Sequence, residues 1–144
     1  MEEEQLKTLC DWLRTAPALA GVKTLWVDGT PAVPGTAGLF PAGVQVTERR
    51  VNLLGEVRER CRAAFTLRVV LPYGGRSAET NAATLLDLQT WVLRQSAAGQ
   101  APVFGNADTD RERLTAAGAR LERATDEGTA VYAVQLKAEY TIQY

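Results

Sequence analysis

The last fourteen residues alternate between apolar and polar side chains, and this pattern constrains the fold more than any other feature of the chain. From Val131 to Tyr144 every even position is apolar, and from Gln135 every odd position is polar. A period of two is characteristic of a β-strand that buries one face. We therefore expect a strand over about 130–144, in a sheet that leaves its other face, or an edge, available to a partner.

The composition is that of one globular domain covering residues 1–144. With 46% hydrophobic and 23% charged residues, a chain of 144 residues can bury a core of its own. The net charge of −1 gives no overall field that would attract nucleic acid or an anionic membrane. No stretch approaches the ~20 apolar residues that span a bilayer, and the acidic start at Glu2–Glu4 is unlike a secretory signal. We expect a cytosolic protein.

The chain has no histidine, and this removes several kinds of site at once. Serine–histidine and cysteine–histidine nucleophilic centres, histidine-ligated zinc and a histidine general base all need that side chain. We therefore expect a protein that is not an enzyme and that holds no metal or cofactor. Cys10 and Cys61 fall on apolar faces, which favours buried, reduced thiols over a disulfide.

Apolar periodicity and turn residues divide the chain into helices and strands. A stripe at helical spacing predicts a helix over about 4–15, and Ser77 is a suitable N-cap for a second helix over about 77–97. Besides the terminal strand, strands are predicted at Val22–Val27, Val44–Leu54, 60–71, Arg111–Ala117 and Ala119–Thr125. This order predicts an α+β fold, with a mainly antiparallel or mixed sheet and helices packed on one face.

Residues 28–43 hold half of the six prolines and several glycines, which predicts a long loop. One apolar pair, Leu39-Phe40, interrupts this segment. The pair can fold back onto the core, which we favour, or it can serve as an exposed anchor for a partner. Leu39 and Phe40 are therefore candidate interface residues.

Three polar motifs lack the spacing of the sites that they suggest. Tyr73-Gly74-Gly75-Arg76-Ser77 could hold a phosphate but lacks the Lys-Ser/Thr of a P-loop, which favours a strand-to-helix turn. Asp108-Thr109-Asp110 is not continued by the ligands of a calcium loop, which favours a solvated loop. Asp126-Glu127 is typical of a turn before the final strand.

Basic residues gather in the middle of the chain. Residues 49–76 carry seven arginines and a net charge of +5, between flanking segments of −3 each. Alternation places Arg60, Arg62 and Arg68 on the polar face of one strand. That face can be a solvated surface paired with carboxylates, a subunit contact or a nucleic-acid surface. The last would more convincingly carry interleaved aromatic residues, and this face offers Thr66 and Val70 instead.

The chain resembles the minor capsid or tail-completion proteins of phages and prophages, in particular the tail terminators of long-tailed bacteriophages. The most specific part of the resemblance is a helix pattern followed by Ala101-Pro102. That pattern is Leu88-Gln89-x-Trp91-Val92-x-x-Gln95. The other parts are Leu9-Cys10-Asp11-Trp12-Leu13, Leu39-Phe40-Pro41-Ala42-Gly43, Leu54-Gly55, Phe65-Thr66-Leu67, Asn81 to Trp91, Val131-Tyr132-Ala133-Val134 and Tyr140.

The resemblance implies an α+β subunit that assembles with itself as a ring, commonly sixfold, on the end of the tail tube. Such a ring stops tube polymerisation and joins the head, with tail-tube and head-completion proteins as partners and DNA passing through its lumen without specific binding. It forms in the bacterial host cytoplasm and stays in the virion. A head-to-tail ring needs two different complementary patches, and the segregated charges can supply them. Other head–tail connector, neck or minor capsid proteins, and a DNA-binding module that uses the central arginines, remain open.

Overall fold

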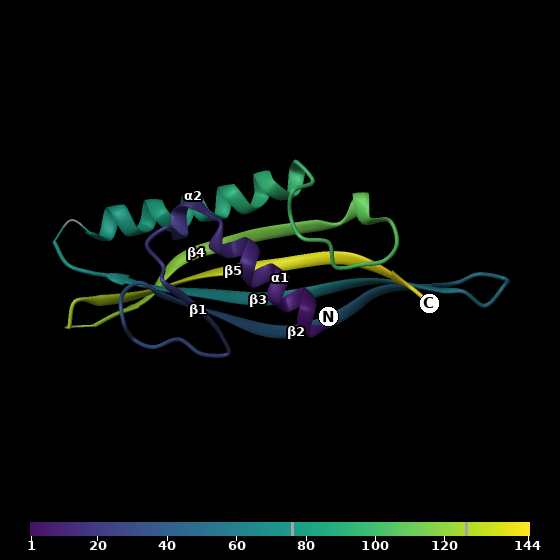
Figure 1. The fold of residues 1–144 in the computed structure, drawn as a ribbon, viewed down its shortest axis with the longest axis horizontal. Helices are drawn as coiled ribbons and strands as arrows, with labels where there is room; N and C mark the ends of the chain where they lie inside the picture. The colour runs from purple at the N-terminus through teal and green to yellow at the C-terminus, as the bar shows by residue number, and fades with distance from the viewer. Residues whose placement is uncertain (76, 126) are drawn as a thin grey trace.

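The computed structural model describes residues 1–75, 77–125 and 127–144. Its elements run in the order shown in Figure 1. They are α1 (Glu3–Arg14), the 3-10 turn η1 (Pro17–Leu19), β1 (Thr24–Val27), β2 (Thr36–Val51), β3 (Val57–Pro72), α2 (Ser77–Ala97), the 3-10 turn η2 (Thr109–Arg111), β4 (Arg113–Ala124) and β5 (Thr129–Gln143). The helices predicted over 4–15 and 77–97 are confirmed to within one residue at each end.

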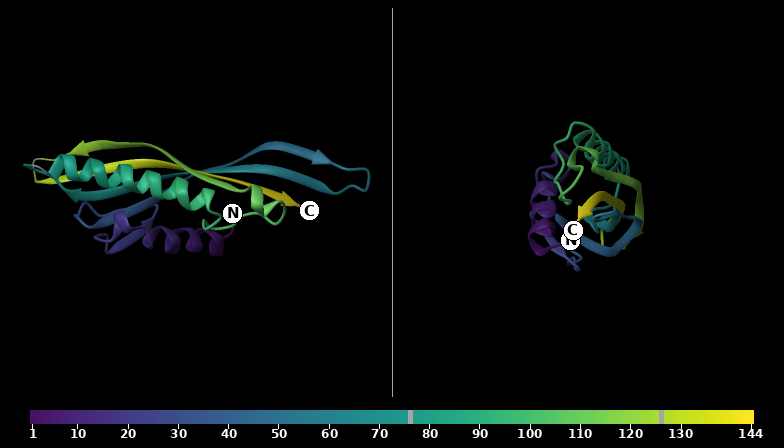
Figure 2. Two further views of the ribbon diagram at one scale, coloured as in Figure 1. Left: turned by 90° about the horizontal axis from the view of Figure 1, so that it is seen from above. Right: turned by 90° about the vertical axis from the view of Figure 1, so that its right-hand side faces the viewer.

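The fold is α+β, as the sequence predicts. Its five strands form one mixed sheet in the order β1-β2-β3-β5-β4, in which β1 and β2 are parallel and the other neighbours antiparallel. In the end-on view of Figure 2 the two helices lie together on one side of the twisted sheet. The Trp12 and Trp91 rings stack with their centroids 4.6 Å apart, joining α1 to α2 above the core.

The predicted terminal strand lies in the interior of the sheet, not at its edge. β5 pairs with β3 on one side, from Arg58↔Gln143 to Pro72↔Thr129, and with β4 on the other. Its even residues from Tyr132 to Tyr140 are buried in the core, as alternation predicts. Both sides of β5 are therefore hydrogen-bonded to strands of the same chain, and the open edges of the sheet lie elsewhere.

The predicted loop over 28–43 is wrong in its second half. β2 begins at Thr36, eight residues before the predicted strand start at Val44, and ends at Val51. Pro41 has no N–H for a ladder, but β1 ends opposite Leu39, so Pro41 lies on an edge where that loss is tolerated. Gly43, with φ of 99°, lies in a bulge that shifts the register between Pro41 and Val44.

The two short strands predicted around Gly118 are a single strand, β4. Gly118 has a φ of 68° and lies at a register shift between Ala117 and Arg120. A bulge therefore accommodates this glycine within the edge strand without ending it.

Two predicted turns include a residue that lies outside the described part of the chain, Arg76 in one and Asp126 in the other. Beside the first, the Gly74 N–H donates to Ser77 Oγ over 2.7 Å. Ser77 is the first helical residue of α2, so the prediction that it is the N-cap is wrong by one position.

Both cysteines are buried and free, which confirms the expected reduced thiols. Burial raises the pKa of the Cys10 thiol and of the Cys61 thiol. Both side chains therefore act as small core residues.

Candidate functional site

The β2–β3 hairpin projects beyond the rest of the molecule (Figure 1). The two strands pair from Thr36↔Val70 to Val51↔Val57, and every residue in 41–56 is exposed. We call residues 44–56 the distal hairpin. β3 stays paired with β5 as far as Arg58, so the distal hairpin consists of an outer strand and a turn that extends past the end of β5. Its surface is thus available to another molecule.

The turn at the end of the distal hairpin is ordered by one side chain. Asn52 Oδ1 accepts hydrogen bonds from the Leu54 N–H over 2.9 Å and from the Glu56 N–H over 3.0 Å. Between them Gly55 adopts a φ of 83°. The side chains of Leu53 and Leu54 point into solvent, and Leu54 is 86% exposed. Two adjacent leucines held at the end of a projecting element form an apolar tip suited to insertion into a partner.

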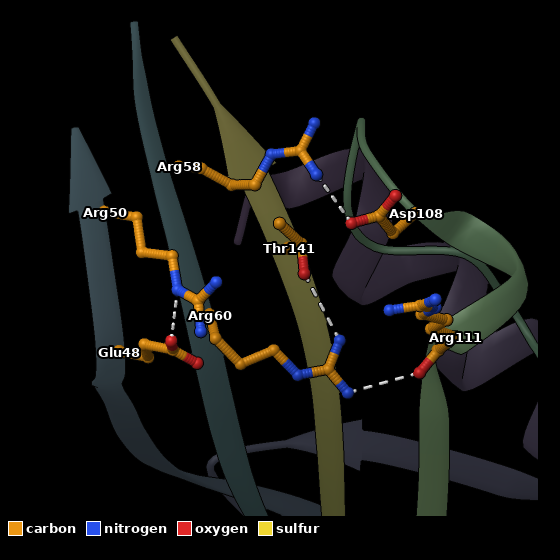
Figure 3. Close-up of a pocket in the computed structure, with 7 residues that line it drawn as sticks. All are labelled: Glu48, Arg50, Arg58, Arg60, Asp108, Arg111 and Thr141. Carbon is orange, nitrogen blue, oxygen red and sulfur yellow. Dashed lines mark hydrogen bonds and ion pairs between the residues drawn. The ribbon is translucent and has the colours of Figure 1, made fainter. Parts of the chain in front are cut away.

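A pocket of about 370 Å³ lies where the distal hairpin meets β5 and the η2 turn, and we call it the arginine pocket. Figure 3 shows its lining. The Arg58 guanidinium donates to Asp108 Oδ2 over 2.8 Å. Arg60 donates to Thr141 Oγ1 and to the Arg111 carbonyl, both over 3.2 Å. The lining residues are Glu48, Arg50, Arg58, Arg60, Asp108, Arg111 and Thr141, with four cationic and two anionic side chains.

The three arginines predicted to share one face do so, but they lie at different places along it. Arg60 alone lines the arginine pocket. Arg62 pairs with Glu139 at 3.0 Å, and Glu139 also lies 3.6 Å from Arg60. This part of the face is therefore an ion-pair network within one chain, consistent with a solvated sheet face.

Arg68 lies at the other end of β3. It donates two hydrogen bonds to the Glu122 carboxylate of β4, over 2.8 and 3.1 Å. These bonds to the charged form hold the pKa of Glu122 below its usual value. The pair ties the edge strand β4 across β5 to β3, a structural role on the same face.

The strand separates Leu39 from Phe40. Leu39 is fully buried, so it belongs to the core and its proposed role in a subunit interface is wrong. Phe40 points to the opposite face and is half-buried beneath Arg68, whose guanidinium carbon lies 4.7 Å from the ring centroid. The preference for the core therefore holds for Leu39, and Phe40 forms a cation–π contact on the arginine face.

The sequence patterns predicted neither the apolar tip nor most of the arginine pocket. A signal for the tip was present, because Leu53-Leu54 stands between Asn52 and Gly55, two residues that favour turns. The remaining arginines of the pocket, Arg50, Arg58 and Arg111, come from separate elements and meet only through the tertiary fold.

Asp108 of the Asp108-Thr109-Asp110 motif pairs with Arg58 instead of meeting other carboxylates. Across residues 1–75, 77–125 and 127–144, no three Asp, Glu or Cys side chains converge so that they could hold a metal ion. Within the same described ranges, no helix combines the length and the hydropathy needed to cross a membrane. The arginine pocket can form ion pairs and the apolar tip can form apolar contacts, and both kinds of interaction serve the binding of another molecule.

Comparison with protein-family models gives no match to this chain, and comparison with curated proteins gives none either.

Proposed function

We propose that this chain is a structural subunit that assembles with copies of itself into a ring at the head–tail junction of a long-tailed bacteriophage or prophage. Its role would be that of a tail terminator or head–tail joining protein, which caps the tail tube and stops its polymerisation. The observation that carries the proposal is the projecting distal hairpin, whose apolar tip is exposed on a single copy of the chain.

Three features support assembly. The exposed tip gives up apolar contact with water only when another molecule covers it. The edge strands of the sheet are β1 and β4, and the part of β2 beyond Leu39 is a further open edge because β1 ends opposite that residue. The charges are segregated along the chain, which can supply the two different patches of a head-to-tail contact.

The resemblance to tail terminators indicates where in the virion this assembly would lie. The expected neighbours are the tail-tube protein on one side and a head-completion protein on the other, with DNA passing through the lumen. Assembly takes place in the cytoplasm of the bacterial host and the ring remains in the virion. A head–tail connector, neck or minor capsid protein is the nearest alternative within the same structural class.

The first test measures absolute mass by light scattering across a concentration series, followed by co-assembly with tail-tube protein. We expect a discrete closed ring, and tail tubes of limited length that carry the protein at one end when imaged by electron microscopy. Tubes that grow to the same length with and without the protein, and carry none of it, would contradict the terminator role. Mass growth without a limit would indicate a filament in place of a ring.

The arginine pocket favours a second candidate, a DNA-binding module. Four arginines against two acidic residues leave an excess of positive charge beside the distal hairpin. Arg111 forms no ion pair within the described part of the chain, which leaves its guanidinium available to a phosphate. Binding of duplex or single-stranded DNA at low salt, falling steeply as salt is raised and weakened by Arg111→Gln, would support this candidate. Absence of binding at low salt would exclude it.

A further inference from the structure

An apolar pocket lies at the base of the hairpin, beside the part of β2 that has no strand on its other side. Its volume is about 280 Å³, and its walls come from the start of α1, from β2 and from β3. Leu6, Pro41, Val44 and Phe65 are among the apolar residues that line it. Because β1 ends opposite Leu39, no described strand covers β2 at Val44. The pocket is therefore open toward a molecule approaching this edge.

The rim of this apolar pocket is acidic. Glu2 and Glu3 line it, and Glu4 follows them in the first turn of α1. All three side chains are exposed, and none forms an ion pair within residues 1–75, 77–125 and 127–144. The chemistry that matches this site is an apolar side chain accompanied by a cation.

The tip of the distal hairpin carries that chemistry. Leu53 and Leu54 supply the apolar side chains, and Arg49 lies on the adjoining end of β2. Arg49 is exposed and forms no ion pair in the part of the chain that the structure describes. The tip and the pocket are therefore complementary in both hydrophobicity and charge.

The tip cannot reach the pocket of its own chain. Val44, which lines the pocket, and Leu53, at the tip, lie on one extended ribbon. At about 3.3 Å per residue, the stretch between them is about 30 Å long. Figure 2 shows the ribbon running away from α1 without folding back. Contact between the two patches therefore requires a second copy.

We propose that the Leu53-Leu54 tip of one copy inserts into the apolar pocket of the next, with Arg49 placed against Glu2 and Glu3. The inference rests on the proposed function and supplies its subunit contact. The two patches are different, so the contact is head-to-tail, and its repetition closes a ring when the rotation between copies allows it. Each copy gives one tip and receives one.

Two variants test the two sides of this contact separately. Leu53→Glu with Leu54→Glu makes the tip acidic and leaves the pocket intact. Val44→Glu places a further carboxylate in the pocket, beside Glu2 and Glu3, and leaves the tip intact. Either change should weaken self-association at least about 30-fold, as loss of a central contact does. Sedimentation velocity across a concentration series measures this, with thermal unfolding to show that each variant is folded.

The matched control is Leu86→Glu with Leu93→Glu, which removes two exposed leucines from α2. It should assemble as the wild type does. An equimolar mixture of the tip variant and the pocket variant should form a 1:1 dimer and nothing larger. In that pair only one competent tip and one competent pocket remain, so the chain of contacts stops after one step.

Three results would overturn the inference. A tip variant that assembles like the wild type would overturn it, and so would a mixture of the two dissociated variants that stays monomeric, since either result would mean a contact other than tip in pocket. Wild-type protein that stays monomeric at every concentration also overturns it. The proposed function is judged separately, because a monomer that still caps tail tubes, or a tip variant that still forms a ring, would preserve it.

Discussion

The two halves of the β2–β3 hairpin have the same pairing but very different surroundings. At its base, Ala37 and Leu39 of β2 and Leu67 and Val69 of β3 are fully buried beneath the helices. In the distal hairpin the apolar residues remain, but Val44, Val46 and Val51 are each about half exposed. One continuous ladder therefore passes from a covered region into an uncovered one.

The difference shows that strand pairing and burial are supplied by different parts of the chain. Pairing comes from the strands themselves, whereas burial comes from the layer formed by α1 and α2. Where that layer ends, the same apolar alternation no longer contributes to the core. Apolar residues kept in such a place point to contacts with another molecule.

The largest expected effect comes from removing strand residues on either side of this boundary. Deleting Tyr140–Tyr144 removes part of the interior strand β5, including the buried Tyr140, and should abolish cooperative unfolding. Replacing residues 50–58 with Asn-Gly should leave the base folded, because that ribbon covers no core and Asn-Gly closes a hairpin. Circular dichroism with thermal unfolding measures both. A cooperative transition in the truncated protein would contradict the interior position of β5.

Substitution of a single leucine at the base or at the tip of the hairpin should show the same difference in stability, with smaller effects. Leu67→Ala opens a cavity at the base and should lower the free energy of unfolding by about 3 kcal/mol. Leu54→Ala at the tip should change it by less than about 0.5 kcal/mol. Urea denaturation of the two variants measures the difference. Equal losses would show that the distal hairpin is packed against something within the same chain.

The smallest expected effect comes from removing one ion pair at the base of the β2–β3 hairpin and one in its distal part. The pKa of Glu122 is lowered when the protein is folded, so its pair with Arg68 adds stability above the ordinary value of 4.5 and loses it as the pH falls through the lowered pKa. Glu122→Gln should therefore cost less than about 1 kcal/mol at pH 7, and the cost should vanish in acid. Urea denaturation at a series of pH values tests this.

The control for that prediction lies in the distal hairpin. Glu48 pairs with Arg50, and both side chains are more than half exposed to solvent. Glu48→Gln should therefore leave the free energy of unfolding unchanged at every pH. A pH-dependent cost at Glu48 equal to that at Glu122 would remove the distinction between the two ends.

The sequence predicts those elements whose side-chain period reflects a covered face. The stripe of α1, the long α2 and the alternation of β5 all arise because one side of each packs on the core. The start of β2 and the continuity of β4 were missed because Pro41, Gly43 and Gly118 usually break strands. Edge positions and bulges tolerate them, and only the neighbouring strands decide which positions are edges.

The same reasoning explains what could be known of the site. Alternation alone places Arg60, Arg62 and Arg68 on one face, because it depends on a single strand. The arginine pocket adds Arg111 from the η2 turn, some fifty residues later in the chain. Its position depends on how that turn crosses β5, which no local pattern encodes. The predicted strand included Leu53 and Leu54, whereas β2 ends three residues before Leu54, at Val51.

The interior position of β5 has a consequence for how the chain folds. The β2–β3 hairpin is local and can form early, whereas β3 and β5 pair across up to 85 residues of sequence. Pairings between such distant segments are slow, because the loop must close before the contacts form. We expect the hairpin to exist transiently with its inner face still uncovered, so the speed at which β5 arrives sets how long the nascent sheet is vulnerable to aggregation.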